Sequence, residues 1–133
     1  MPDPVRRVTS PAMDPFIPLY VALMVLLAVN LRALKAFDEL VETIWEHHRA
    51  LWIAQGRPIG TFWRPEDPDI RLVSSLAARR RLRRGLMRTS PDWLPDDSPA
   101  HLKIATYRVV NLVGWGGLAL VGIGLGVWGI LVG

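Results

Sequence analysis

The side chains best suited to bind a metal ion or move a proton gather in one short segment. Glu42, Glu46, His47 and His48 lie within a stretch of seven residues. Di-iron helical sites repeat a Glu-x-x-His pair on several helices, and zinc proteases use His-Glu-x-x-His. The chain has neither pattern, and one helix cannot supply a full coordination shell. We therefore interpret the cluster as the solvated surface of a helix and expect no metal site.

Other patterns that carry chemistry do not occur in the sequence either. The cysteine count of 0 excludes disulfides, thiolate metal sites, iron–sulfur clusters and cysteine nucleophiles. The chain has no P-loop, no dinucleotide fingerprint and no nucleophile elbow. Neither long apolar stretch contains a histidine, which excludes bis-histidine haem ligation inside a bilayer. We expect no catalytic residue, no cofactor and no enzymatic activity.

Two long apolar stretches of the sequence predict the main helices of the protein. Phe16–Leu31 holds 16 uncharged residues, which reach about 24 Å as a helix, a little less than a hydrocarbon core of about 30 Å. Val109–Gly133 holds 25 uncharged residues, enough to cross a bilayer with some tilt. The sequence predicts an all-α membrane protein, with transmembrane helices at 15–31 and about 109–132 joined by a cytoplasmic helical hairpin.

Basic residues give the expected orientation. Of the 16 Lys and Arg, 14 lie between the apolar stretches and none follows the second. Because cytoplasmic loops are enriched in Lys and Arg, we expect a bacterial inner (cytoplasmic) membrane protein with a cytoplasmic middle region and periplasmic N- and C-termini. Arg6-Arg7 suggests a signal peptide, but Pro11, Pro15 and Pro18 interrupt the segment after this pair, so we expect an uncleaved anchor.

The segments outside the membrane differ in composition. Residues 1–14 are polar and proline-rich, which predicts a disordered tail. Apolar positions at helical spacing predict an amphipathic helix over 32–55 that continues the first membrane helix and ends near Gln55-Gly56. The sequence further predicts a Gly/Pro connector over 56–68 and a basic helix over 69–88. A Pro-rich loop over 89–98 and a final helix over 99–133, which contains the second span, follow.

Two local signals refine these segments. Phe62-Trp63 is expected to hold the connector against the helices or the headgroup layer. Ser98-Pro99 combines an N-cap residue with a proline at the first helical position, which predicts the start of the last helix.

A run of arginines is the strongest charge feature, and it comprises Arg79, Arg80, Arg81, Arg83 and Arg84. We expect these residues to contact anionic lipid headgroups, where each basic residue contributes about 1 kcal/mol. The alternative is pairing with the acidic face of the helix over 38–46. No recognition fold or stacking aromatic accompanies the run, so nucleic acid is not expected as a partner.

The last helix carries a stripe of small residues on one face: Ala119, Gly122, Gly126, Gly129 and Gly133. Such a stripe allows another transmembrane helix to approach closely, from the same chain, a second copy or a larger membrane complex. Gly114, Gly117 and Gly124 form a second, weaker line. Asn30 and Asn111, near the cytoplasmic ends of the spans, could bond across a helix pair.

The order of these elements resembles the bacterial universal stress protein B family. The local match consists of Gly56-Arg57-Pro58, then Ile70-Arg71-Leu72-Val73, Ala77, Arg79 and Arg81. The resemblance implies a two-pass inner-membrane protein linked to stationary-phase stress, and it carries over no catalytic residue. The chain differs by an additional N-terminal tail, an insertion around Pro91–Pro99 and a more glycine-rich last helix.

Three function classes remain. The first is a non-enzymatic, stress-related accessory or scaffold protein of the inner membrane. The second is a small subunit or assembly factor of a larger respiratory or photosynthetic membrane complex, docked through the glycine stripe. The third, a holin-like pore former, is disfavoured because the C-terminal segment has no basic tail.

Overall fold

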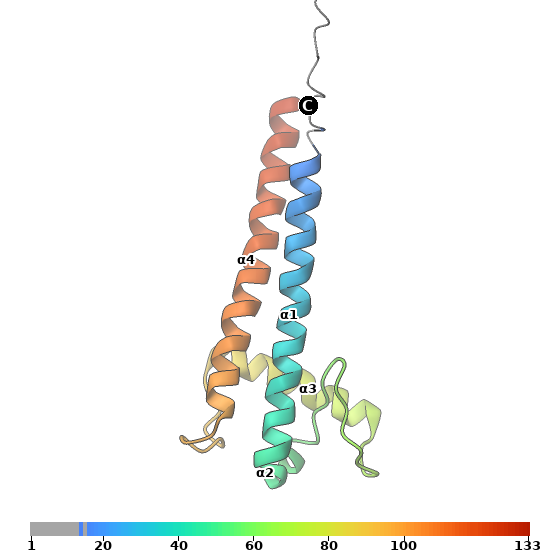
Figure 1. Ribbon diagram of the computed structural model, residues 1–133, viewed down its shortest axis with the longest axis vertical. Coiled ribbons are helices and arrows are strands. Elements are labelled where there is room, and N and C mark those ends of the chain that lie inside the picture. The colour runs from blue at the N-terminus through green and yellow to red at the C-terminus, as the bar shows by residue number, and fades with distance from the viewer. Residues whose placement is uncertain (1–13, 15) are drawn as a thin grey trace, which may run out of the picture.

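The computed structural model describes residue 14 and residues 16–133, and this part of the chain is helical without any strand. It contains α1 (Ile17–His47), α2 (Arg49–Ala54), α3 (Leu72–Arg88) and α4 (Ala100–Val132). α1 and α4 run antiparallel and side by side, and α3 lies across their lower part (Figure 1). The all-α fold class is confirmed. The predicted tail, residues 1–14, lies outside the described residues except for Asp14.

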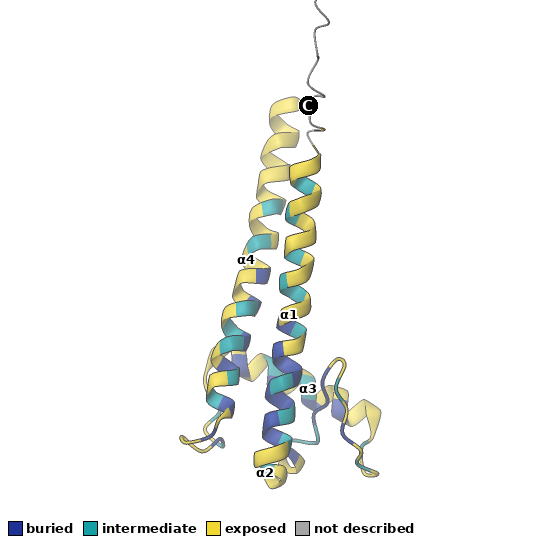
Figure 2. Cartoon of the chain, viewed as in Figure 1, coloured by how far each residue is buried: buried dark blue, intermediate teal, exposed yellow. Residues whose placement is uncertain are grey.

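The upper parts of α1 and α4 are long and apolar enough to cross a membrane. In the most apolar window of α1 only 6% of the residues are buried, and in that of α4 none is. Figure 2 shows these parts as mostly exposed ribbon. A core helix of a water-soluble protein would instead bury such residues, so this pattern fits helices whose apolar surface faces lipid.

The protein's own hydrophobic core lies at the opposite end, where the lower halves of α1 and α4 meet α2 and α3 (Figure 2). Phe37 on α1 packs against Tyr107 on α4 with ring centroids 5.5 Å apart. Trp52 is fully buried. The other members are Ala36, Leu40, Val41, Ile44, Leu82, Leu86, Leu94, Ala100 and Ile104. This core gives this end of the molecule a fixed shape.

The predicted uninterrupted helix to Gln55-Gly56 is wrong at one residue. His48 leaves the helical region, with φ −136° and ψ 55°, and separates α1 from α2. Its side chain lies 2.7 Å from Ser98 Oγ, and the bend lets the buried Trp52 indole donate a hydrogen bond to the Pro58 carbonyl at 2.9 Å. These tertiary contacts override the local helical preference.

The glycine cap at the end of this segment is confirmed. Gly56 has φ 89°, and its N–H bonds to the Ile53 carbonyl while the Arg57 N–H bonds to the Trp52 carbonyl, both at 3.0 Å. This pair of bonds is the Schellman motif, which needs a left-handed residue after the helix.

The later boundaries shift by a few residues. α3 begins at Leu72 rather than 69, after a turn in which the Ile70 N–H bonds to the Asp67 carbonyl. α4 begins at Ala100 rather than 99, and Ser98 Oγ accepts the Ala100 N–H at 3.2 Å. α1 packs mainly against α4, and α3 meets α1 through side chains such as Arg79 on Phe37. A cytoplasmic hairpin formed by the amphipathic and basic helices therefore stays a prediction.

Candidate functional site: an arginine pocket between α3 and α4

α3 separates its buried and exposed residues onto two faces. Ser75, Ala78, Leu82 and Leu86 are buried. The other side exposes large apolar residues among its arginines: Leu72, Val73, Leu76 and Met87. A helix of this kind, apolar and basic on its open side, suits the boundary between headgroups and acyl chains.

A pocket of about 450 Å³ lies between this open face of α3 and the middle of α4. Arg79, Arg80, Arg83 and Arg84 line it from α3, together with Leu76 and Met87, and Asn111 and Trp115 line it from α4. Trp115 is 63% exposed. The pocket therefore joins a basic rim to an apolar wall at the level where the long apolar part of α4 begins.

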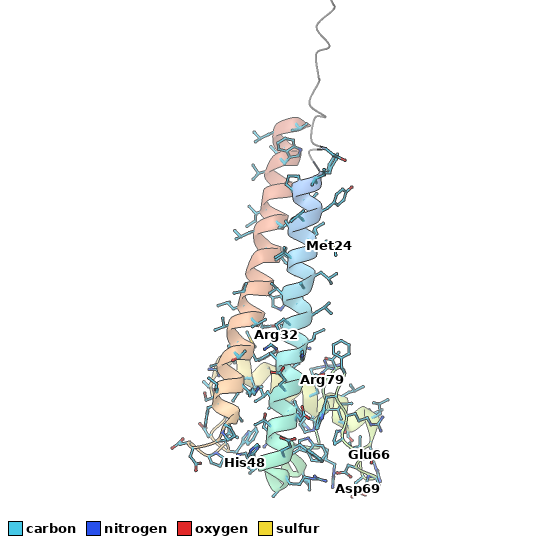
Figure 3. All side chains as sticks on the ribbon, viewed as in Figure 1. Met24, Arg32, His48, Glu66, Asp69 and Arg79 are labelled. Carbon is cyan, nitrogen blue, oxygen red and sulfur yellow. The ribbon has the colours of Figure 1, made fainter. Side chains whose placement is uncertain are left out.

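Two of these arginines are held in place by neighbouring elements. Arg79, labelled in Figure 3, lies in the lower part of the molecule. It donates to Thr61 Oγ1 and lies over the Phe37 ring, 5.7 Å from its centroid. Arg83 Nε donates to Tyr107 Oη at 3.4 Å, and its guanidinium lies 5.9 Å from the Phe37 centroid. Burial, and then the charge of Arg83, lower the pKa of Arg79, while Asp38 opposes this shift. The Nε of Arg79 is buried without a hydrogen-bond partner.

The structure brings together four of the five predicted arginines and separates the fifth. Arg81 lies apart, where it lines depressions with Gly56, Gln55 and Arg57 instead. Arg80 and Arg81 are consecutive in the sequence, but neighbouring residues of a helix point about 100° apart. The pocket is therefore lined by Arg80 and not by Arg81.

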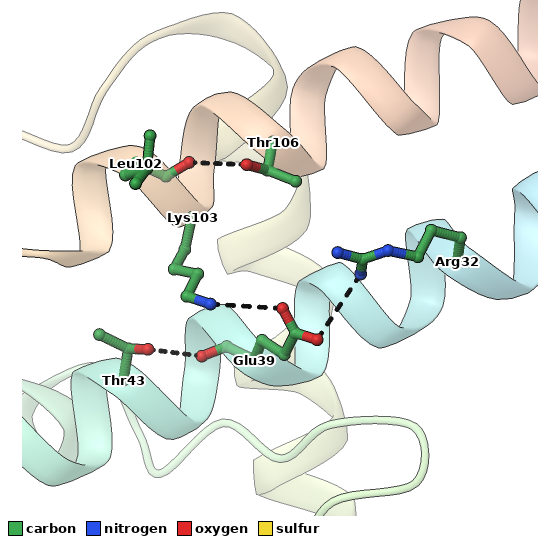
Figure 4. Close-up of polar contacts among 6 residues, drawn as sticks. All are labelled: Arg32, Glu39, Thr43, Leu102, Lys103 and Thr106. Atoms are coloured by element: carbon green, nitrogen blue, oxygen red, sulfur yellow. Dashed lines mark hydrogen bonds and ion pairs between the residues drawn. The ribbon is translucent and has the colours of Figure 1, made fainter.

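Acidic partners for this arginine run are not found in the described part of the chain. On α1, Glu39 pairs with Arg32 at 3.6 Å and with Lys103 at 3.4 Å (Figure 4). The other ion pairs join Arg57 to Asp67 and Asp69. The alternative in which the arginines pair with the acidic face of α1 therefore has no ion pair to support it.

The carboxylate of Asp38 is a structural site that the sequence did not reveal. Asp38 is buried, at 6% exposure, and its oxygens accept the backbone N–H groups of Thr61, Phe62 and Trp63 at 2.5, 2.7 and 3.1 Å. Because Asp38 belongs to the predicted acidic face of the helix over 38–46, the sequence suggested that its side chain faces solvent. Its partners lie in an irregular loop 23 to 25 residues away, so no local signal pointed to them.

The loop held by Asp38 is the predicted connector. Trp63 packs against Trp45 with ring centroids 5.8 Å apart, so the expected attachment to the helices is confirmed for this residue. Phe62 is 73% exposed instead. The loop in turn places Thr61 beside Arg79, and so Asp38 supports one wall of the arginine pocket.

The small-residue stripe does not contact α1. Ala119, Gly122, Gly126, Gly129 and Gly133 are all exposed, and a β-carbon at Gly122, Gly126 or Gly129 would meet nothing within 4 Å. Two members of the weaker line approach α1 closely: a β-carbon on Gly114 would lie 3.0 Å from Asn30 Oδ1, and one on Gly117 would collide with Leu26. A β-carbon on the third member, Gly124, would meet nothing within 4 Å. The stripe's partner stays a prediction.

The remaining polar candidates make separate contacts. His48 lies at the lower end of α1 (Figure 3), bonded to Ser98, and Glu46 and His47 are exposed. Asn30 Nδ2 donates to its own helix, to the Leu26 carbonyl at 2.8 Å. Asn111 Nδ2 lies 3.4 Å from the Met87 sulfur of α3. The described structure therefore shows no hydrogen bond between the two asparagines.

Comparison with known proteins adds no further assignment: no family model, no curated protein and no solved structure matches this chain.

Proposed function

We propose that this chain is a two-pass protein of the bacterial inner membrane that acts without catalysis, as an accessory or scaffold protein. α1 and α4 cross the bilayer with their upper parts, the 32–106 region faces the cytoplasm, and both termini face the periplasm. α3 lies at the cytoplasmic headgroup layer. The resemblance to the universal stress protein B family adds a stress-related role to this proposal.

The observation that carries the proposal is the contrast between the upper and lower parts of α1 and α4. The upper parts of α1 and α4 expose apolar side chains, and the lower parts enclose a packed core. Arg32, Lys35, Lys103 and Arg108 lie where one part gives way to the other. Basic residues close to the end of a span favour a cytoplasmic location for that end, which supports the proposed orientation.

Membrane extraction and fusion reporters test this proposal. Membranes from expressing bacteria are washed with alkaline carbonate, and reporters active only in the periplasm or only in the cytoplasm are inserted after Arg64 and fused after Gly133. We expect the protein to stay in the pellet, with a cytoplasmic signal at 64 and a periplasmic signal after 133. Release by carbonate, or a periplasmic signal at 64, would reject the proposal.

The second candidate is a small subunit or assembly factor of a larger membrane complex. The open face at Gly122, Gly126 and Gly129 supports it, because small residues allow a close partner helix and α1 leaves this face free. Purification in mild detergent separates the two candidates. A stoichiometric large partner favours the subunit, and a chain that is isolated alone or with copies of itself favours the accessory protein.

A further inference from the structure

We infer that the arginine pocket between α3 and α4 is a binding site for one anionic phospholipid, whose phosphate lies among the arginines and whose acyl chain lies along Trp115. This inference rests on the proposed function, because the lipid reaches the pocket only if α4 spans a bilayer. It names the class of ligand, an anionic phospholipid, that the proposed membrane protein would bind.

The charge of the pocket selects an anion. Four guanidinium groups line it, and no Asp or Glu does. Guanidinium groups offer planar pairs of N–H donors that match phosphate oxygens, and they lose less hydration than ammonium groups when they are partly buried.

The same charge pattern discriminates between phospholipids. Phosphatidylethanolamine carries an ammonium group beside its phosphate, and a pocket lined by arginines without a carboxylate would repel it. Phosphatidylglycerol and diphosphatidylglycerol carry phosphate without a cation. We therefore expect the pocket to prefer these two lipids, and the doubly charged diphosphatidylglycerol to bind at least as well as phosphatidylglycerol.

The shape of the pocket indicates an amphiphile rather than a free ion. Its apolar lining comes from Leu76 and Met87 on α3 and from Trp115 on α4, and these residues are 39%, 42% and 63% exposed. An inorganic phosphate would leave that surface uncovered. Tryptophan at a membrane interface contacts headgroups with its N–H and acyl chains with its rings, which fits a lipid seated against α4.

The four pocket arginines differ in whether they already form hydrogen bonds within the protein. Arg79 and Arg83 already bond to Thr61 and Tyr107, whereas Arg80 and Arg84 are exposed and make no hydrogen bond or ion pair that the described structure shows. Arg80 and Arg84 are therefore the residues to change, because their replacement removes ligand contacts and leaves the core intact.

The test uses the purified full chain in a mild detergent and native mass spectrometry to count retained lipids. The probes are phosphatidylglycerol, diphosphatidylglycerol, phosphatidylethanolamine and inorganic phosphate. The pocket variant is Arg80→Gln with Arg84→Gln. The matched control is Arg81→Gln with Arg88→Gln, which removes the same charge from α3 outside the pocket lining.

We expect the parent and the control to retain one anionic lipid and the pocket variant to bind it about thirtyfold more weakly, because two arginines are removed. Equal weakening in both variants would show general surface attraction and overturn the inference, as would equal retention of phosphatidylethanolamine or no loss in the pocket variant. Displacement of the lipid by millimolar inorganic phosphate would assign the site to a free anion and also overturn it. Carbonate extraction of the same proteins distinguishes this failure from that of the proposed function: a protein that stays in the membrane without lipid preference refutes only the pocket.

Discussion

The carboxylate of Asp38 occupies the space that a side chain on Gly60 would need. Asp38 on α1 reaches the loop here and accepts three consecutive backbone N–H groups, from Thr61 to Trp63. Gly60 itself donates its N–H to the Trp63 carbonyl at 3.0 Å, which closes the loop. The absence of a β-carbon at Gly60 is what allows the carboxylate and the loop to meet.

Gly60→Ala should therefore destabilise the protein. The new β-carbon would collide with the Asp38 carboxylate, and moving either group weakens hydrogen bonds to a buried charge, a loss of about 1 to 3 kcal/mol. Thermal unfolding in detergent measures it. Gly85→Ala is the matched control, because its β-carbon would meet nothing within 4 Å and alanine is favoured over glycine inside a helix by about 1 kcal/mol. Equal stability changes in both variants would contradict the described contact.

Asp38→Asn should weaken the attachment of the loop, and Asp38→Ala should weaken it more. Both oxygens of Asp38 accept backbone N–H groups, and an asparagine would turn its own N–H₂ toward one of these donors. We expect faster hydrogen exchange at the amides of residues 61–63 in both variants, with a loss of about 1 to 3 kcal/mol in stability for Asp38→Asn and a larger loss for Asp38→Ala. Glu46→Gln, at an exposed position of the same helix, should leave the exchange unchanged. Unchanged protection in Asp38→Ala would show that the carboxylate is not the acceptor.

The two glycine lines of α4 should have separable effects. Gly114→Val with Gly117→Val places side chains against Asn30 and Leu26, so it should separate α1 from α4 and lower the thermal unfolding midpoint. Gly126→Val with Gly129→Val has the same spacing, and the β-carbons at both positions would meet nothing within 4 Å, so it should leave the midpoint unchanged. A native detergent gel then reports whether the second variant loses a partner or a second copy. A midpoint that falls equally in both would show that our assignment of the α1-facing line is wrong.

Local patterns in the sequence were sufficient for the helices, because hydrophobic periodicity, the glycine at position 56 and Ser98-Pro99 act within a few residues. They were insufficient for contacts between distant segments. The bend at His48 depends on Ser98, which is 50 residues away. The separation of Arg81 from the pocket depends on the face of α3 that meets the core. The glycine stripe was visible as a pattern, but the face of α4 that meets α1 is set by Leu26 and Asn30.

The most direct test of the two-span topology uses single cysteines, because the natural chain contains 0 cysteines. Arg64→Cys and Val132→Cys are both exposed positions, and each is labelled with a membrane-impermeant maleimide in intact spheroplasts and again after permeabilisation. The proposed topology predicts that Val132→Cys is labelled in intact spheroplasts and Arg64→Cys only after permeabilisation. Labelling of Arg64→Cys in intact spheroplasts, or labelling of both positions only after permeabilisation, would contradict it.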